Sequence, residues 1–116
     1  MRHLILPAAL LLLAGCTRIP LDNRLDGAYE AYQQGDCDRA MLELSRAERL
    51  SRSRSYLQPE ISLLRGHCLE RQGLFVDAGE TYRFIVQRYP TSEYAYRARA
   101  RLDTLGQLGH LKSTTE

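Results

Sequence analysis

The sequence predicts an all-α protein, and three observations support this fold class. After Pro20, apolar residues recur at the spacing of amphipathic helices. Glycine and proline stand between the periodic segments, at Gly35, Gly73 and Pro90, where helices end. No window alternates between apolar and polar residues for long enough to form a strand. We therefore expect about five helices, arranged as two helical hairpins followed by a capping helix.

The first hairpin is predicted from two apolar stripes separated by a glycine. A first helix, closed by Gly35, carries apolar residues at positions i, i+3, i+4 and i+7, namely Leu25, Ala28, Tyr29 and Tyr32. Asp36 is a suitable cap for the second helix, because its carboxylate accepts hydrogen bonds from the free N–H groups of a first turn. The apolar face of this second helix consists of Ala40, Met41, Leu44 and Ala47.

Three further helices follow in the second half of the chain. Pro59 opens the third at the position where helices tolerate proline best, and Gly73 ends it. The fourth runs from about Phe75 to Tyr89 and is stopped by Pro90. Thr91 or Ser92 caps the fifth. The inward residues of these helices are predicted to be Ile61, Leu64 and Cys68, then Ala78, Tyr82 and Ile85, then Ala95, Ala98, Leu102 and Leu105.

The first fifteen residues have the layout of a secretory signal peptide. A short basic start precedes an apolar run from Leu4 to Leu13 that is too short to span a bilayer. The run ends in Leu13-Ala14-Gly15-Cys16, which resembles the lipobox of bacterial lipoproteins. The resemblance implies that Cys16 is lipidated and becomes the first residue of the mature chain. The alternative is an ordinary signal peptide that ends near a cysteine.

The predicted lipid anchor places the protein in the bacterial envelope. A single acyl chain holds only marginally, so stable attachment takes two or more chains, and bacterial lipoproteins usually carry three. Thr17 follows the cysteine, where an aspartate favours retention in the inner membrane of enteric-type bacteria. We therefore expect attachment to the outer membrane, facing the periplasm, with the inner membrane as the alternative.

The remaining chain is long enough for one small domain. We expect residues 16–21 to form the lipidated cysteine and a short tether, residues 22–109 a helical domain, and residues 110–116 a disordered tail. Removal of residues 1–15 lowers the formal net charge from +2 to +1, because Arg2 is lost. A nearly neutral chain offers no electrostatic basis for binding nucleic acid.

The two predicted hairpins also match each other in sequence. Residues 31–40 align with residues 69–78, and the turn glycines Gly35 and Gly73 are 38 residues apart. This pattern resembles the tetratricopeptide repeat, whose period is about 34 residues. The additional residues fit a longer connection around residues 51–56. The resemblance implies helical hairpins that stack side by side and bury a continuous core.

A second resemblance lies in the segment 82–95, which continues to Ala98 and Leu102. It is similar to the repeat joint of outer-membrane β-barrel assembly lipoproteins and of the tetratricopeptide coordinator of the Tol–Pal system. Membership of this broad group implies a lipid-anchored adaptor that binds a protein or peptide partner. The alternative is a permanent accessory subunit of an envelope machine, for outer-membrane protein assembly, secretion or envelope integrity. Neither role requires a cofactor or a small-molecule substrate.

The resemblance also implies which residues face the concave, partner-binding groove. Such repeats bind with their first helices, and mapping the inward positions predicts a groove of mixed aromatic, charged and aliphatic residues. The predicted groove residues are Leu25, Tyr29, Tyr32, Gln33, Leu63, His67, Glu70, Arg71, Tyr94, Arg97 and Arg101. Tyrosine and arginine are typical of binding surfaces. The alternative is that Tyr29, Tyr32 and Tyr94 only pack between helices.

Catalytic and metal-binding patterns are weak in this sequence, so we do not expect an enzyme. The mature chain has two histidines, His67 and His110, and no nucleophile elbow or phosphate-binding loop. His67 and Cys68 are adjacent, so on a helix they point about 100° apart, and no further ligands have metal spacing.

Four arginines gather near the connection between the hairpins, namely Arg46, Arg49, Arg52 and Arg54. They suit either of two roles. Anionic lipid head groups attract such clusters. Alternatively, they form a solvated helix end, where cations are favourable.

Cys37 and Cys68 are the two further cysteines of an exported chain, and the periplasm is oxidising. In the repeat arrangement, Cys37 begins one helix and Cys68 lies late in an antiparallel neighbour, so a disulfide is predicted. The alternative is two free cysteines that pack as small apolar residues.

Overall fold

The computed structural model describes residues 18–112, and in this range every regular element is helical. The elements are α2 (Arg18–Gln33), α3 (Cys37–Leu50), the short 3-10 helix η1 (Ser55–Leu57), α4 (Gln58–Arg71), α5 (Phe75–Arg88) and α6 (Glu93–Gln107). The prediction of an all-α fold with five helices is therefore confirmed for the described residues. Their order, two hairpins and one final helix, is compatible with the expected helical repeat.

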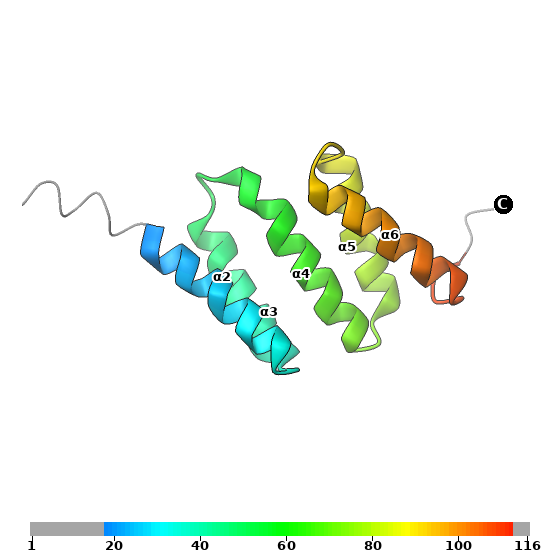
Figure 1. The fold of residues 1–116 in the computed structure, drawn as a ribbon, viewed down its shortest axis with the longest axis horizontal. Coiled ribbons are helices and arrows are strands. Elements are labelled where there is room, and N and C mark those ends of the chain that lie inside the picture. The colour runs from blue at the N-terminus through cyan, green and yellow to red at the C-terminus, as the bar shows by residue number, and fades with distance from the viewer. Residues whose placement is uncertain (1–17, 113–116) are drawn as a thin grey trace, which may run out of the picture.

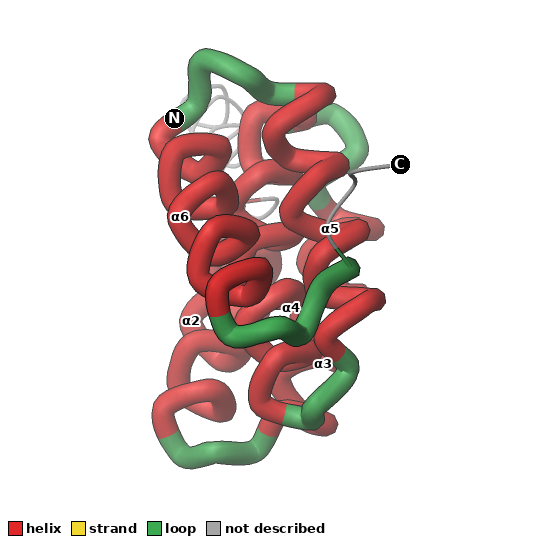
Figure 2. The backbone as a smooth tube through the Cα atoms, turned by 90° about the vertical axis from the view of Figure 1, so that its right-hand side faces the viewer, coloured by secondary structure: helices red, strands yellow, loops and turns green. Residues whose placement is uncertain are grey.

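The helices form two layers (Figure 1). The central helix α4 contacts α2 on one side and α6 on the other, and these three helices run in the same direction. The second layer contains α3, which packs against α2 and α4, and α5, which packs against α4 and α6. The connections lie at the two ends of the bundle, as Figure 2 shows from the side. The row of α2, α4 and α6 is therefore one continuous surface.

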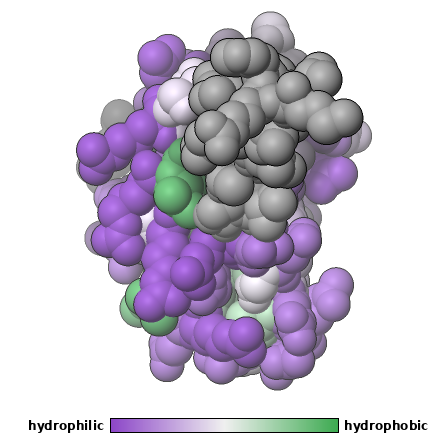
Figure 3. Space-filling model, turned by 90° about the vertical axis from the view of Figure 1, so that its left-hand side faces the viewer, coloured by the Kyte–Doolittle hydropathy of each residue, from purple (hydrophilic) through white to green (hydrophobic). Residues whose placement is uncertain are grey.

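The outer face of α2 is acidic, whereas its inner face is apolar. Asp22, Asp26 and Glu30 are exposed at a spacing of four residues, so they share one side of the helix. The surface at this side of the molecule is mainly hydrophilic wherever it is not covered by grey atoms (Figure 3).

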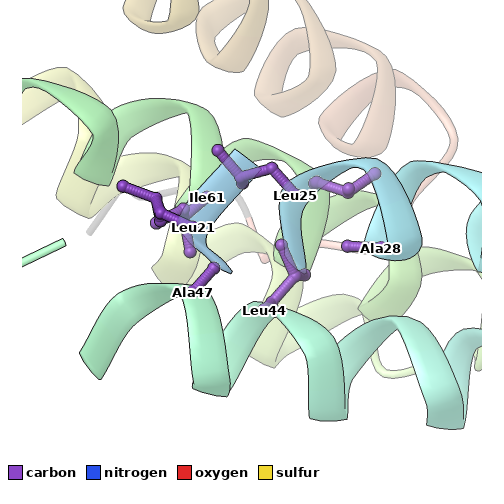
Figure 4. Close-up of a cluster of buried hydrophobic side chains, with 7 residues drawn as sticks. Leu21, Leu25, Ala28, Leu44, Ala47 and Ile61 are labelled. Atoms are coloured by element: carbon purple, nitrogen blue, oxygen red, sulfur yellow. The ribbon is translucent and has the colours of Figure 1, made fainter. Parts of the chain in front are cut away.

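Two apolar clusters and one cysteine-centred cluster form the core. The first joins α2, α3 and α4, and Figure 4 shows its members: Leu21, Leu25 and Ala28 of α2 lie near Leu44, Ala47 and Ile61. The second joins α4, α5 and α6, and its largest fully buried side chain is that of Tyr82. The fully buried alanines let the helices approach closely. All inward residues predicted from the sequence lie in or against these clusters.

The two hairpin turns have the same geometry. Gly35 and Gly73 adopt φ values of 78° and 76°, a left-handed conformation that favours glycine. In each turn the next backbone N–H bonds back to the helix: Asp36 N to Ala31 O at 2.8 Å, and Leu74 N to Leu69 O at 2.9 Å. Gly109 repeats this turn after α6, with a φ of 76°. The sequence repeat is thus also a repeat of backbone conformation.

Several predicted helix boundaries are confirmed. The Asp36 carboxylate accepts a hydrogen bond from Arg39 N at 3.0 Å and caps α3. The Ser92 hydroxyl accepts one from Tyr94 N at 3.1 Å and caps α6. Pro59 lies at the start of α4.

The predicted tether at residues 16–21 is wrong over its second half. α2 already begins at Arg18, and Leu21 is fully buried in the first core cluster. Pro20 lies in the first turn of α2. Backbone N–H groups in a first turn have no acceptor within the helix, so proline, which lacks this group, costs no helical hydrogen bond there. The predicted signal peptide, Cys16 and Thr17 lie outside the described residues.

The tail predicted at residues 110–116 is also ordered at its beginning. The His110 ring stacks on Phe75, with 3.7 Å between centroids and 13° between planes. Leu111 packs against the second core cluster. The domain therefore extends to at least Lys112, and residues 113–116 lie outside the described range.

Candidate binding groove

A pocket of about 430 Å³ opens on the row of first helices. Its lining consists of Tyr32 from α2, His67, Glu70 and Arg71 from α4, and Arg101 from α6. All five belong to the groove predicted from the sequence. The three α4 residues follow the spacing i, i+3, i+4, which places them on one helix face. The pocket thus has α4 as its floor and α2 and α6 as its walls.

Glu70 fixes α6 to the floor of the pocket. Its carboxylate accepts two hydrogen bonds from Arg101, from Nε at 2.9 Å and from Nη2 at 2.6 Å. The hydroxyl of the buried Tyr82 donates a third at 2.8 Å. Burial acts to raise the pKa of Glu70, but the hydrogen bonds from Arg101 and Tyr82 outweigh it and hold this pKa below its usual value. Glu70 is therefore an ionised anchor inside the groove.

Arg71 connects α4 to the end of α2. Its guanidinium lies 3.6 Å from the centroid of the Tyr32 ring, a cation–π contact. It also donates a hydrogen bond to the backbone carbonyl of Tyr32. This carbonyl lies in the last turn of α2 and also accepts a hydrogen bond from the backbone N–H of Gly35 at 3.0 Å. The positive charge of Arg71 remains exposed at the mouth of the pocket.

His67 lies between two aromatic rings at the centre of the pocket. Its ring centroid is 6.0 Å from that of Tyr32 and 6.1 Å from that of Tyr82. Burial lowers the pKa of His67, the charge of Glu70 opposes this, and the arginines Arg101, Arg71 and Arg97 lower it further. His67 is therefore neutral at pH 7, and its ring offers one hydrogen-bond donor and one acceptor.

The row of first helices also carries a second polar contact, centred on Glu60. The Tyr29 hydroxyl donates a hydrogen bond of 2.7 Å to the Glu60 carboxylate. Burial and this hydrogen bond raise the pKa of Tyr29. Burial and the nearby charge of Glu60 also raise the pKa of Tyr94. Arg97 lies over the Tyr94 ring at 5.7 Å and pairs with Glu93 at 3.5 Å. Tyr29 is thus tied to the scaffold, and Arg97 is exposed.

Six of the eleven predicted groove residues do not line the pocket, namely Leu25, Tyr29, Gln33, Leu63, Tyr94 and Arg97. Leu25 and Leu63 are only 9% and 4% exposed, because they pack into the two core clusters. Their assignment to the groove surface is wrong. Gln33 is exposed at the end of α2, beside the pocket residue Tyr32. Sequence reasoning missed Glu60 and assigned Tyr82 only to the core. The sequence could have indicated Glu60, because this residue precedes His67 by two helical turns and so lies on the same helix face.

The cysteine pair lies directly behind the pocket floor. Cys37 and Cys68 form a disulfide whose Cα atoms are 5.3 Å apart, within the range of ordinary disulfides. Cys68 is fully buried and follows the pocket residue His67 in the chain. The bridge links α3 to the late part of α4, so it holds the two hairpins together where the pocket opens.

Residues 18–112 carry neither a metal-type cluster nor a membrane-spanning helix. In this range no three side chains of the His, Cys, Asp and Glu types are grouped so as to hold a metal ion. None of the helices in the same range has the length and apolar character needed to cross a bilayer. The sequence matches no known protein family model, no curated protein and no solved structure.

Proposed function

We propose that this protein is a lipid-anchored adaptor of the bacterial periplasm, attached to the outer membrane through Cys16. Its tetratricopeptide-like scaffold holds a protein or peptide partner in the groove of α2, α4 and α6, without chemistry of its own. The lipobox-like sequence around Cys16 supports the anchor. The repeated hairpins and their matching glycine turns support the scaffold.

The pocket on the row of first helices carries this proposal. Its volume of about 430 Å³ is enough for one or two side chains of a bound segment. Its lining combines an aromatic face, guanidinium groups and a neutral imidazole, which suit contacts that are both apolar and polar. The fixed ion pair of Glu70 with Arg101 keeps the walls in place before a partner arrives, which lowers the ordering cost of binding.

The charge balance of the pocket indicates the kind of segment it binds. Arg71 and Arg101 contribute two positive charges, and Glu70 contributes one negative charge that Arg101 already neutralises. Because His67 is neutral, no carboxylate of the pocket lining balances the positive charge of Arg71 at the pocket mouth. The partner segment is therefore one that presents a carboxylate or another hydrogen-bond acceptor beside an apolar side chain.

Photocrosslinking in living cells tests the proposal. A photoreactive amino acid at Gln33, beside the pocket, is expected to capture a defined partner. The same residue at Leu42, which is 50% exposed on α3, serves as the control position and is expected to capture little. Equal capture at both positions, or none at Gln33, contradicts the groove as the binding surface.

A pair of charge reversals sharpens the test. Arg71→Glu with Arg97→Glu is expected to reduce the capture at Gln33. Arg39→Glu with Arg83→Glu, at exposed positions of α3 and α5, is expected to leave it unchanged. The far-ultraviolet circular dichroism of both variants checks that the helices remain. Loss of helical content in the first variant shows instead that its arginines belong to the scaffold.

The alternative function is a permanent accessory subunit of an envelope machine. Such a subunit exposes a large apolar patch and self-associates without its partner. The exposed large apolar side chains are spread over several elements: Leu42, Leu50, Tyr56, Leu74, Val76, Phe84, Tyr96 and Leu108. This spread favours the adaptor. Sedimentation of the delipidated protein distinguishes the two, because an adaptor stays monomeric and a permanent subunit associates.

A further inference from the structure

One end of the bundle gathers the beginnings of the first helices. The starts of α2, α4 and α6 and the ends of α3 and α5 lie at the same end, together with the connections 51–57 and 89–92 (Figures 1 and 2). We call it the proximal end. The hairpin turns at Gly35 and Gly73 lie at the opposite, distal end.

The proximal end is rich in exposed arginine. Arg49, Arg52 and Arg88 are exposed there. Compensation of the helix dipole accounts for Arg49 and Arg88, in the last turns of α3 and α5, but Arg52 lies beyond any helix. Tyr56, at 70% exposure, and Leu50, at 45%, add apolar surface to the same end.

The carboxylates at this end leave much of the positive charge uncompensated. Glu48 pairs with Arg65 at 2.7 Å, and Glu93 pairs with Arg97 at 3.5 Å. Asp22, near the start of α2, and Glu60, in the first turn of α4, offset two further positive charges. The distal end differs, because its turns carry the exposed carboxylates of Asp36, Asp38 and Asp77 together with the exposed guanidinium groups of Arg39 and Arg71. The two ends of the bundle therefore differ in charge character.

The proximal end is also the end that the proposed anchor reaches. Only Thr17 separates Cys16 from Arg18, the first residue of α2. Two residues span at most about 7 Å, so the lipidated cysteine lies within that distance of the helix start. Leu21 is fully buried, so the first turns of α2 are fixed to the domain. A lipid on Cys16 thus holds the proximal end at the bilayer surface.

We propose that the proximal end docks on anionic phospholipid head groups, with Arg49, Arg52 and Arg88 at the phosphates and Tyr56 in the interface. The proposal rests on the lipid anchor of the proposed function and adds a fixed orientation to it. Arginines near an anionic surface are each attracted to it, and tyrosine is favoured at the level of the head groups. The distal end mixes acidic and basic side chains, so the same surface attracts it less.

The orientation has a consequence for the pocket. Tyr32 follows Arg18 by fourteen residues on α2, which at the helical rise places the pocket about 20 Å from the proximal end. A docked domain therefore stands with its helices away from the bilayer and opens its pocket into the periplasm. A domain that lay on its side would bring one wall of the groove against the lipid.

Tryptophan fluorescence tests the orientation, because the natural chain contains no tryptophan. Tyr56→Trp places a single reporter at the proximal end, and Leu74→Trp places one at the distal end, where the native leucine is 46% exposed. The lipidated protein is reconstituted into vesicles of phosphatidylethanolamine and phosphatidylglycerol that contain brominated acyl chains. We expect a blue shift and at least twofold quenching for Tyr56→Trp, and neither effect for Leu74→Trp. Equal quenching of both, or none for Tyr56→Trp, overturns the docking.

Charge reversal on the same reporter tests the role of the arginines. Arg49→Glu with Arg52→Glu is expected to abolish the quenching of Tyr56→Trp, as is replacement of phosphatidylglycerol by phosphatidylcholine. The matched control, Arg39→Glu with Arg83→Glu, is expected to leave the quenching unchanged. Quenching that persists in the first variant contradicts the electrostatic contact.

Mass measurement of the amino-terminal peptide separates this proposal from the proposed function. A preparation that is acylated on Cys16 but shows no quenching of Tyr56→Trp overturns the docking and leaves the anchor intact. A preparation from the native host that carries no acyl group on Cys16 overturns the anchor, and the docking with it.

Discussion

Replacing Gly66 by alanine tests how tightly the two helices of the second hairpin are packed. Gly66 lies on α4 against Tyr82 of α5. A Cβ atom at this position would lie 2.4 Å from Cε1, 2.8 Å from Cζ and 3.0 Å from Cδ1 of the tyrosine ring. Carbon atoms in good contact are about 3.5 to 4.0 Å apart, so the ring has to move by about 1 Å or more.

The cost of that movement follows from how the ring is held. Tyr82 is fully buried, and its hydroxyl donates a 2.8 Å hydrogen bond to Glu70. Overpacking of this kind costs about 1 to 3 kcal/mol, and weakening a buried hydrogen bond to a charged group costs about 1.5 to 3 kcal/mol. Alanine is favoured over glycine inside a helix by about 0.5 to 1 kcal/mol, which offsets a minor part of these two destabilising contributions. Together these contributions predict that Gly66→Ala lowers the free energy of unfolding by about 2 to 5 kcal/mol.

Urea unfolding followed by circular dichroism measures this loss, and Gly27→Ala provides the matched control. A Cβ at Gly27 would meet Glu43 atoms only at 3.7 Å, an ordinary contact, so this variant is expected to be as stable as the natural protein or slightly more stable. If the alanine Cβ clashes with the Tyr82 ring, the double variant Gly66→Ala with Tyr82→Leu should lose less unfolding free energy than the sum of the two single variants. Natural stability of Gly66→Ala, or an equal loss in Gly27→Ala, refutes the reasoning.

Three further predictions follow from the cysteines and from His67. Cys16→Ser is expected to leave the protein without an acyl group and to move it out of the membrane fraction; unchanged fractionation contradicts the anchor. Thiol titration of the denatured, non-reduced mature protein is expected to find Cys37 and Cys68 oxidised, and reduction is expected to cost about 3 to 4 kcal/mol of stability because the closed loop spans 31 residues; two free thiols exclude the bridge. The folded state lowers the pKa of His67 below 6.5, so the unfolded chain binds more protons as the pH falls through this value and the free energy of unfolding should decrease. Unfolding curves at pH 7.5 and 5.5 are expected to show a smaller decrease for His67→Asn, and an equal decrease in both proteins contradicts the assignment.

The candidate groove shows how far spacing alone predicts a surface. His67, Glu70 and Arg71 share a helix face by their spacing, and the structure places all three in the pocket. Leu25 has a similar position on its helix, but its apolar side chain packs into the first core cluster and does not line the pocket. The sequence offers no sign that Arg101 pairs with Glu70, because 31 residues separate them and only the packing of α6 against α4 brings them together.

The sequence by itself determined the helices and their ends, because these depend on local rules: apolar spacing, caps such as Asp36, and glycines that adopt a positive φ. It also determined the match between the hairpins at Gly35 and Gly73. Tertiary structure decided where the domain begins and ends, because the burial of Leu21 and the stacking of His110 on Phe75 depend on partners distant in the chain. It alone decided the protonation of the pocket, since the pKa of His67 and of Glu70 is set by burial and by arginines that folding brings near.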